Sequence, residues 1–127
     1  MKMPLESGTI CLKHKCSLCC HRTNMLLTYF DMNRIVKLGY GINGFAEKMD
    51  GCWHLKNVDG KCFFLNDGLC RIYKYRPYGC QLYPLIFNLE RGKVMLDEIC
   101  PYRLEFRVNA DDVRKLIFML KILKILQ

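Results

Sequence analysis

Residues 62–84 decide the fold, and they read Cys62-Phe-Phe-Leu-Asn-Asp-Gly-Leu-Cys70-Arg-Ile-Tyr-Lys-Tyr-Arg-Pro-Tyr-Gly-Cys80-Gln-Leu-Tyr-Pro84. Turn residues separate the three cysteines: Asn66-Asp67-Gly68 stands before Cys70, and Arg76-Pro77-Tyr78-Gly79 stands before Cys80. Pro77 ends a helix, and Gly79 permits a backbone turn that few other residues tolerate. The pattern therefore predicts short segments that bring thiolates together from separate parts of the chain.

A denser group of cysteines lies nearer the N-terminus. Cys16, Cys19 and Cys20 form a C-x2-C-C cluster, with Cys11 five residues before it. A C-x2-C spacing lets two thiolates reach one tetrahedral metal from a tight turn. The adjacent Cys19 and Cys20 would point to opposite sides of an extended backbone. The spacing leaves open whether a bent backbone brings both to one metal or whether the pair serves two metals or a multinuclear cluster.

The number of cysteines favours metal binding over disulfides. The chain has 127 residues and 9 cysteines, an odd number that cannot be fully paired. It begins without an apolar stretch that resembles a signal peptide. Its apolar runs fall short of the roughly 18 residues that span a bilayer. We therefore expect a cytoplasmic protein without a membrane span, in a compartment where structural disulfides are rare.

The motifs quoted above resemble the CxxCxxCC cysteine-cluster family, described as zinc- or iron-chelating, which includes YkgJ-type proteins and the flagellin lysine N-methylase (FliB-type). The matching residues are Cys62-x-Phe-Leu, Cys70-x-Ile-Tyr, Arg76-Pro-x-x-Cys80, Tyr83-Pro84 and the Leu27-Thr28-x-x-Asp31 segment. The resemblance covers residues 11–101. It departs from the family pattern at Lys13, where the first cysteine is expected and for which Cys11 is the substitute.

The resemblance implies a set of metal ligands and a choice of cofactor. Its ligand positions are Cys16, Cys19, Cys20, Cys62, Cys70 and Cys80, with Cys100 and Cys11 as additions. Cys52 matches nothing in the pattern and is expected to be a free or buried thiol. The implied cofactor is zinc or a [4Fe–4S] iron–sulfur cluster, and the methylase relative favours the cluster.

Histidine and arginine side chains near the cysteines have competing interpretations. His14, His21 and His54 are possible zinc ligands, but eight candidate thiolates make them unnecessary, so solvated or hydrogen-bonded roles are expected. Arg76 either donates hydrogen bonds to thiolates or a substrate carboxylate, or bonds a backbone carbonyl.

The sequence predicts an α+β fold with residues 1–127 as a single domain, organised around the cysteine-ligated metal site. Thr28 and Asp31 are candidate caps of a helix that ends before Gly39. The segment 57–60 is predicted to turn a hairpin between 52–56 and 61–65, and a second hairpin is predicted over 85–96. Other short elements are expected at 25–28 (strand), 32–38, 45–49 and 71–75 (helices).

A C-terminal helix is predicted over residues 111–126, capped by Asp111 or Asp112. Its apolar residues recur at helical spacing, which is typical of a core helix: Val113, Leu116, Ile117, Leu120, Leu123 and Leu126. The same helix is a candidate docking element for a protein partner or a membrane surface.

Three functions follow from these patterns. The first is a metal-binding protein that chelates an iron–sulfur cluster or zinc through its cysteines. The second is a metal-cluster-dependent enzyme related to protein-lysine N-methylase, although a Gly-rich nucleotide loop is missing from the sequence. The third is a zinc-ribbon-like nucleic-acid-binding module, motivated by the net charge of +8. The basic residues are scattered along the chain, which argues against nucleic acid as a partner.

Overall fold

A computed structural model of the chain describes residues 2–5, 10, 13–14 and 16–125. These residues form a mixture of short helices and strands, which confirms the predicted α+β class with hairpins and a C-terminal helix. The chain divides into two compact units: Ser17–Tyr78, and Met1–Cys16 together with Gly79–Gln127. They are called the cysteine unit and the terminal unit below. The prediction of one domain over residues 1–127 stays a prediction.

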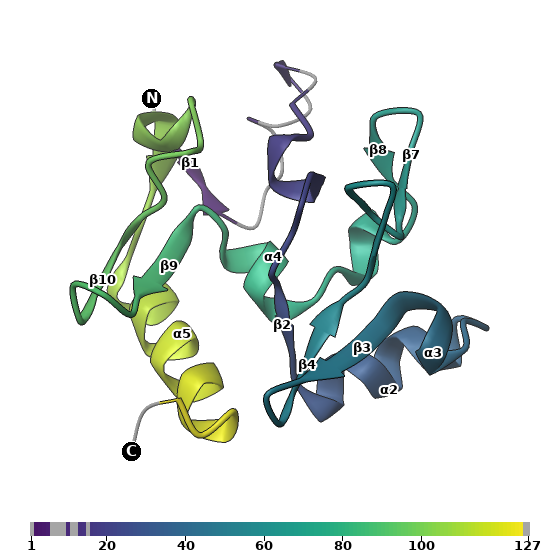
Figure 1. Ribbon diagram of the computed structural model, residues 1–127. Helices are drawn as coiled ribbons and strands as arrows, with labels where there is room; N and C mark the ends of the chain where they lie inside the picture. The colour runs from purple at the N-terminus through teal and green to yellow at the C-terminus, as the bar shows by residue number, and fades with distance from the viewer. Residues whose placement is uncertain (1, 6–9, 11–12, 15, 126–127) are drawn as a thin grey trace. The chain divides into compact units, whose positions relative to one another are not determined.

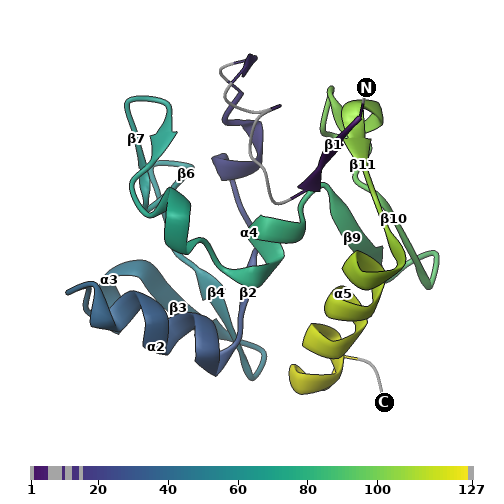
Figure 2. The ribbon, with the colours of Figure 1, turned by 180° about the vertical axis from the view of Figure 1, so that it is seen from behind.

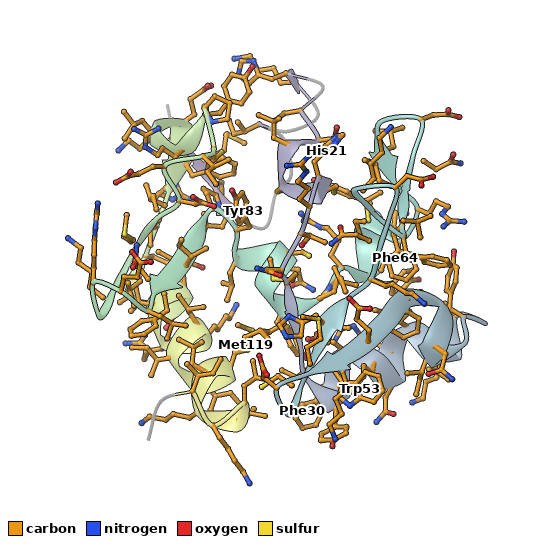
Figure 3. All side chains as sticks on the ribbon, viewed as in Figure 1. His21, Phe30, Trp53, Phe64, Tyr83 and Met119 are labelled. Atoms are coloured by element: carbon orange, nitrogen blue, oxygen red, sulfur yellow. The ribbon has the colours of Figure 1, made fainter. Side chains whose placement is uncertain are left out.

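The cysteine unit is built on a three-stranded antiparallel sheet of β2 (Leu26–Leu27), β4 (Cys52–Leu55) and β3 (Ala46–Met49), in the order β2-β4-β3. Helix α2 (Tyr29–Lys37) follows β2 directly, and the short α3 (Ile42–Phe45) leads into β3 (Figures 1 and 2). Phe45 and Phe64 are almost fully buried, and their ring centroids lie 5.6 Å apart. These two rings (Phe64 is labelled in Figure 3) anchor the apolar interior of this unit.

Helix α2 has a well-defined start and end. The Thr28 side chain accepts a hydrogen bond from the Asp31 amide (3.1 Å), and the Asp31 carboxylate accepts one from the Thr28 amide (2.9 Å). This is a capping box, in which Thr28 is the N-cap and Asp31 the third helical residue. After the helix, Gly39 takes φ = +106°, a conformation that favours glycine at a helix end. Of the two candidate caps, Thr28 is the N-cap, so the helix begins at Tyr29, three residues before the predicted start at residue 32, and its predicted end before Gly39 is confirmed.

Two small hairpins follow the sheet. Strand β5 (Asn57–Val58) pairs with β6 (Lys61–Cys62), and β7 (Leu65–Asn66) pairs with β8 (Leu69–Cys70). Their turns, Asp59-Gly60 and Asp67-Gly68, have positive φ at both residues, which Asp-Gly pairs tolerate in hairpins. The predicted turns at 57–60 and 66–68 are therefore confirmed.

The predicted pairing of 52–56 with 61–65 is wrong. Strand β4 pairs with β3, so the residues 45–49 that were expected to be helical form a strand after Phe45. The reason is Asp50-Gly51, whose φ values of 53° and 80° close a tight hairpin between Met49 and Cys52. Further along the chain, the helix predicted at 71–75 is a 3-10 turn, η3 (Tyr73–Tyr75), which ends before Pro77.

The terminal unit packs its last helix against a hairpin. Strands β9 (Leu85–Asn88) and β10 (Lys93–Leu96) form the predicted antiparallel hairpin, and α5 (Ala110–Ile122) contacts β9 (Figure 1). Short elements complete the unit. Helix α4 (Tyr78–Leu82) begins one residue before the unit resumes at Gly79, and a 3-10 turn spans Arg103–Glu105. Strand β1 (Met3–Pro4) pairs in parallel with β11 (Phe106–Arg107). The core includes Leu82, Leu85, Cys100, Phe106, Leu116, Met119 and Leu120.

The boundaries of α5 differ from the prediction. Asn109 is the N-cap, with its side chain accepting from the Asp112 amide at 2.9 Å, and Asp112 closes the capping box. The helix ends at Ile122, and Lys124 takes φ = +61°. Leu126 lies outside the described residues. Within the described part of the chain, no helix is long and apolar enough to cross a bilayer.

The capping box of α2 gives a stability prediction. Thr28→Ala removes a buried cap and should lower the free energy of unfolding by about 1–2 kcal/mol, measured by chemical denaturation. Asn33→Ala, on the exposed side of the same helix, is the control and should change it by less than about 0.5 kcal/mol. Equal losses for the two variants would contradict the role of the cap.

Candidate metal centre

Cys19 and Cys20 lie in a single 3-10 turn, η2 (Leu18–Cys20). The turn is closed by backbone hydrogen bonds from Cys20 to Ser17 (2.9 Å) and from His21 to Leu18 (3.0 Å). The bend places the two thiols in a hydrogen bond with each other, Cys20 donating to the Cys19 sulfur. The backbone is therefore bent at this pair, and the choice between one metal, two metals and a multinuclear cluster stays open.

The chain beyond η2 is tied to the β5–β6 hairpin. His21 (labelled in Figure 3) forms an antiparallel bridge with Lys61, and the Arg22 amide donates to the Gly60 carbonyl at 2.7 Å. Asn57 then bonds the backbone of Thr23 twice, its Oδ1 accepting from the amide (3.1 Å) and its Nδ2 donating to the carbonyl (2.8 Å). Because antiparallel pairing of 21 with 61 aligns 20 with 62, these contacts set Cys20 beside Cys62.

Cys70 is brought to the same place by the second hairpin. It pairs with Leu65 across β7–β8, and Leu65 lies only three residues after Cys62 in the sequence. The Arg71 amide that follows it donates to the Phe64 carbonyl at 2.8 Å, and buried Phe64 fixes that carbonyl. The two hairpins therefore present Cys62 and Cys70 towards η2, and the four cysteines 19, 20, 62 and 70 form what we call the sulfur group.

Electrostatics show that the members of the sulfur group interact. The pKa of Cys19 is lowered to about 7, mainly by the hydrogen bond from Cys20, while the surrounding protein atoms partly desolvate the sulfur and oppose the shift; the Arg76 charge and a backbone amide also lower it. The pKa of Cys20 is raised strongly, first by donating that bond, then by burial, and then by repulsion from the thiolates of Cys19, Cys62 and Cys70.

The remaining two thiols have raised pKa values. Burial is the main cause for both Cys62 and Cys70, and each is also raised by the negative charge of a neighbouring cysteine. Backbone amides oppose the shift at both residues, and Arg76 opposes it at Cys70. Four sulfurs that repel one another when ionised form a site suited to a cation, because a bound cation removes the repulsion.

The donor chemistry fits zinc or an iron–sulfur cluster, since both take four thiolates. Among the residues that the structure describes, no three His, Cys, Asp or Glu side chains already stand close enough to hold a metal ion. A chelated ion would therefore have to draw the four sulfurs inward.

The other predicted ligands belong to the terminal unit. Cys16 is half-buried, Cys80 is half-buried in α4, and Cys100 is buried in the apolar core. Cys11 lies outside the described residues. The ligand roles of these four cysteines stay predictions. Cys52, the expected non-ligand, is half-buried in β4 opposite Met49.

The side chains of His14 and His54 form hydrogen bonds, and the side chain of His21 faces solvent. His14 Nε2 lies 3.0 Å from Glu105 Oε2, and its ring stacks on Tyr102 with centroids 3.8 Å apart. His54 Nδ1 lies 3.3 Å from the Asn24 carbonyl, and His21 is exposed. These are the hydrogen-bonded and solvated roles that the sequence favoured over metal binding.

Arg76 takes the second role considered for it, the bond to a backbone carbonyl, and its bonding to a thiolate or a substrate stays a prediction. Its Nε donates to the Tyr73 carbonyl (3.0 Å), its guanidinium lies 4.1 Å from the Tyr73 ring centroid, and its charge favours the thiolates of Cys19 and Cys70. Sequence reasoning missed two residues that hold the backbone on either side of Pro77: Asp31 accepts from the Tyr78 amide (3.0 Å), and Arg34 donates to the Arg76 carbonyl (2.8 Å). Asp31 was interpreted only as a cap, although its place in the Leu-Thr-x-x-Asp motif was a signal of a wider role.

Comparison with known proteins supports the assignment of a metal centre. A family model described as "CxxCxxCC: Putative zinc- or iron-chelating domain" matches residues 10–101, which include all four cysteines of the sulfur group. The search of curated proteins and the search of solved structures each gave no match to this chain.

The sulfur group predicts an order of alkylation in the metal-free protein. Cys19 is exposed and its lowered pKa makes it a thiolate above about pH 7, so iodoacetamide at pH 7.5 should modify it well before Cys62 and Cys70, whose raised pKa values keep them protonated. Peptide mass spectrometry over time measures the order. In the unfolded protein the three rates should converge, and equal rates in the folded protein would contradict the assignment.

Proposed function

The chain belongs to the CxxCxxCC family of zinc- or iron-chelating domains, and on that premise we propose that it binds an iron–sulfur cluster or zinc through its cysteine thiolates. The observation that carries the proposal is that one 3-10 turn and two hairpins bring Cys19, Cys20, Cys62 and Cys70 near enough for their charges to affect one another. Family membership gives the general chemistry, and the sulfur group gives the residues that would perform it.

The four sulfurs would act as the first ligands, with Cys16 and Cys80 as the next candidates. When bound, zinc would fasten the segments to one another, and an iron–sulfur cluster would add the capacity for electron transfer. The protein residues hold the thiolates in place through backbone hydrogen bonds and exclude water through Phe64 and Ile72, both buried beside the hairpins.

We favour a [4Fe–4S] cluster over zinc, on the resemblance to the flagellin lysine N-methylase. Protein purified without oxygen should be brown, absorb near 400 nm, and contain iron and acid-labile sulfide. A colourless protein that contains stoichiometric zinc would show that the bound metal is zinc and not a cluster. The proposed chelation by thiolates would then still hold. Protein that takes up neither zinc nor iron would contradict the proposed function.

A pair of variants tests the ligand assignment. Cys70→Ser should lower the metal content by roughly half or more, because a structural site that loses one of four thiolates loses much of its binding free energy. Cys52→Ser changes a half-buried cysteine of the same unit that is outside the sulfur group, and should leave the metal content near the wild-type value. Elemental analysis measures both, and equal losses would show that the ligands are wrongly assigned.

A protein partner that binds α5 is part of the same proposal. The exposed side of this helix carries Phe118, 65% exposed, with Lys115 and Lys121 nearby and Arg114 paired with Asp111, and this basic side suits an acidic partner surface. A cytoplasmic location would keep the thiolates reduced and available to metal. The enzymatic and nucleic-acid-binding alternatives stay predictions.

A further inference from the structure

One face of the three-stranded sheet carries a group of side chains that the proposed function does not use. In the β3–β4 hairpin (Figure 1), Met49 is paired with Cys52 and Glu47 is paired with His54. Paired residues, and residues two apart in one strand, point to the same face of a sheet, so these four side chains share one face. The opposite face is buried, and its residues include Leu27, Ala46 and Leu55.

The spacing on this face suits a single bound ion. Met49 and Cys52 flank the tight Asp50-Gly51 turn, and the Cβ atoms of such a pair lie about 4.5–5.5 Å apart. His54 stands two residues from Cys52, a rise of roughly 6–7 Å along the strand. Met49 is 50% exposed, and its unbranched side chain can swing over the face without leaving a packed position. A thioether, a thiol and an imidazole can therefore meet above the sheet.

His54 is held in the form that a metal ligand needs. Its Nδ1 lies 3.3 Å from the Asn24 carbonyl, which only accepts hydrogen bonds, so Nδ1 carries the proton in this contact. The lone pair of a neutral imidazole is then on Nε2. Histidines that bind metals commonly donate their other ring N–H to a carbonyl in this way, which fixes the ring orientation.

Two sulfurs and one imidazole favour a soft cation. Thioether and thiolate sulfur select Cu(I), and imidazole also suits copper. Cu(I) with the Cys52 thiolate and two neutral ligands is a neutral centre, which costs little desolvation on a half-buried face. Zn²⁺ would need the exposed Glu47 carboxylate as well, and within the described ranges Glu47, Cys52 and His54 are not gathered into a set that could hold an ion.

We propose that Met49, Cys52 and His54 form a second metal site, which takes Cu(I). On binding, the Cys52 sulfur forms a bond to copper and its proton passes to solvent, with no change in oxidation state. This site goes beyond the proposed function, because it shares no ligand with the sulfur group and takes a different metal. Either site can fail without the other.

NMR signals from the ligands themselves test the proposal. Protein labelled with ¹³C in its methionine methyl groups and with ¹⁵N in its histidine rings is titrated with Cu(I) without oxygen. The titration continues past saturation of the sulfur group, whose thiolates also bind Cu(I). The Met49 methyl and His54 Nε2 signals should shift together and saturate. Met95, half-buried on β10 opposite Ile86, is the internal control and should not shift.

Variants separate a built site from chance binding to an exposed thioether. In Cys52→Ser the Cu(I)-dependent shift of the Met49 methyl should be lost, and Cys52→Ala takes its place if the serine variant is not folded. Met49→Leu keeps an apolar side chain of similar volume and should move the His54 response to higher Cu(I). Met95→Leu is the matched control and should leave that response unchanged. The amide spectrum of each variant establishes that it is folded.

Two kinds of result would overturn the proposal. A Met49 shift that persists without the Cys52 sulfur, or signals of Met49 and His54 that stay unchanged in excess Cu(I), would remove the site. A response of His54 to Zn²⁺ that leaves Met49 unmoved and is abolished by Glu47→Gln would remove its assignment to Cu(I). The zinc or iron of the sulfur group should be the same in Cys52→Ser and in the wild type, so these results leave the proposed function unaffected.

Discussion

Four thiols that cannot all ionise side by side without a cation are the constraint on which the rest of the cysteine unit depends. Burial and mutual repulsion raise the pKa values of Cys20, Cys62 and Cys70, while the hydrogen bond from Cys20 lowers that of Cys19. Cys20, Cys62 and Cys70 therefore stay protonated in the empty protein near neutral pH, and a bound cation would have to displace their protons. Because an unfolded chain does not hold four thiolates together, metal binding and folding of this unit are expected to be coupled.

Each sulfur is held by backbone geometry, and the means differ between segments. A 3-10 turn folds the adjacent Cys19 and Cys20 to one place, an antiparallel bridge at His21 aligns Cys20 with Cys62, and the Asp67-Gly68 turn returns the chain to Cys70. Helix α2 also contacts this part of the chain, because its buried Asp31 accepts a hydrogen bond from the Tyr78 amide, just before Cys80. A helix that is remote in the sequence thus contacts the backbone at Tyr78.

Much of this was predictable from the sequence, and the failures have physical causes. The Asp-Gly turns, the Thr28 cap and the 85–96 hairpin follow from local conformational preferences, and the structure has all three. Strand pairing is non-local, so the partner of 52–56 was missed when Asp50-Gly51 was overlooked as a hairpin turn. The role of Asp31 depends on a contact with Tyr78, 47 residues away, which no local pattern reveals. The cysteines of the sulfur group could be named as candidates from the sequence because thiolate chemistry does not depend on the order of the segments, and their role as ligands stays a prediction.

X-ray absorption at the edge of the bound metal tests the central claim most directly. The account predicts a first shell made of sulfur at about 2.3 Å, whether the metal is zinc or the iron of a cluster. Replacing Cys62 with serine should then introduce a lighter scatterer into that shell. A first shell of nitrogen and oxygen in the wild-type protein, or a sulfur shell that is unchanged by the substitution, would contradict it.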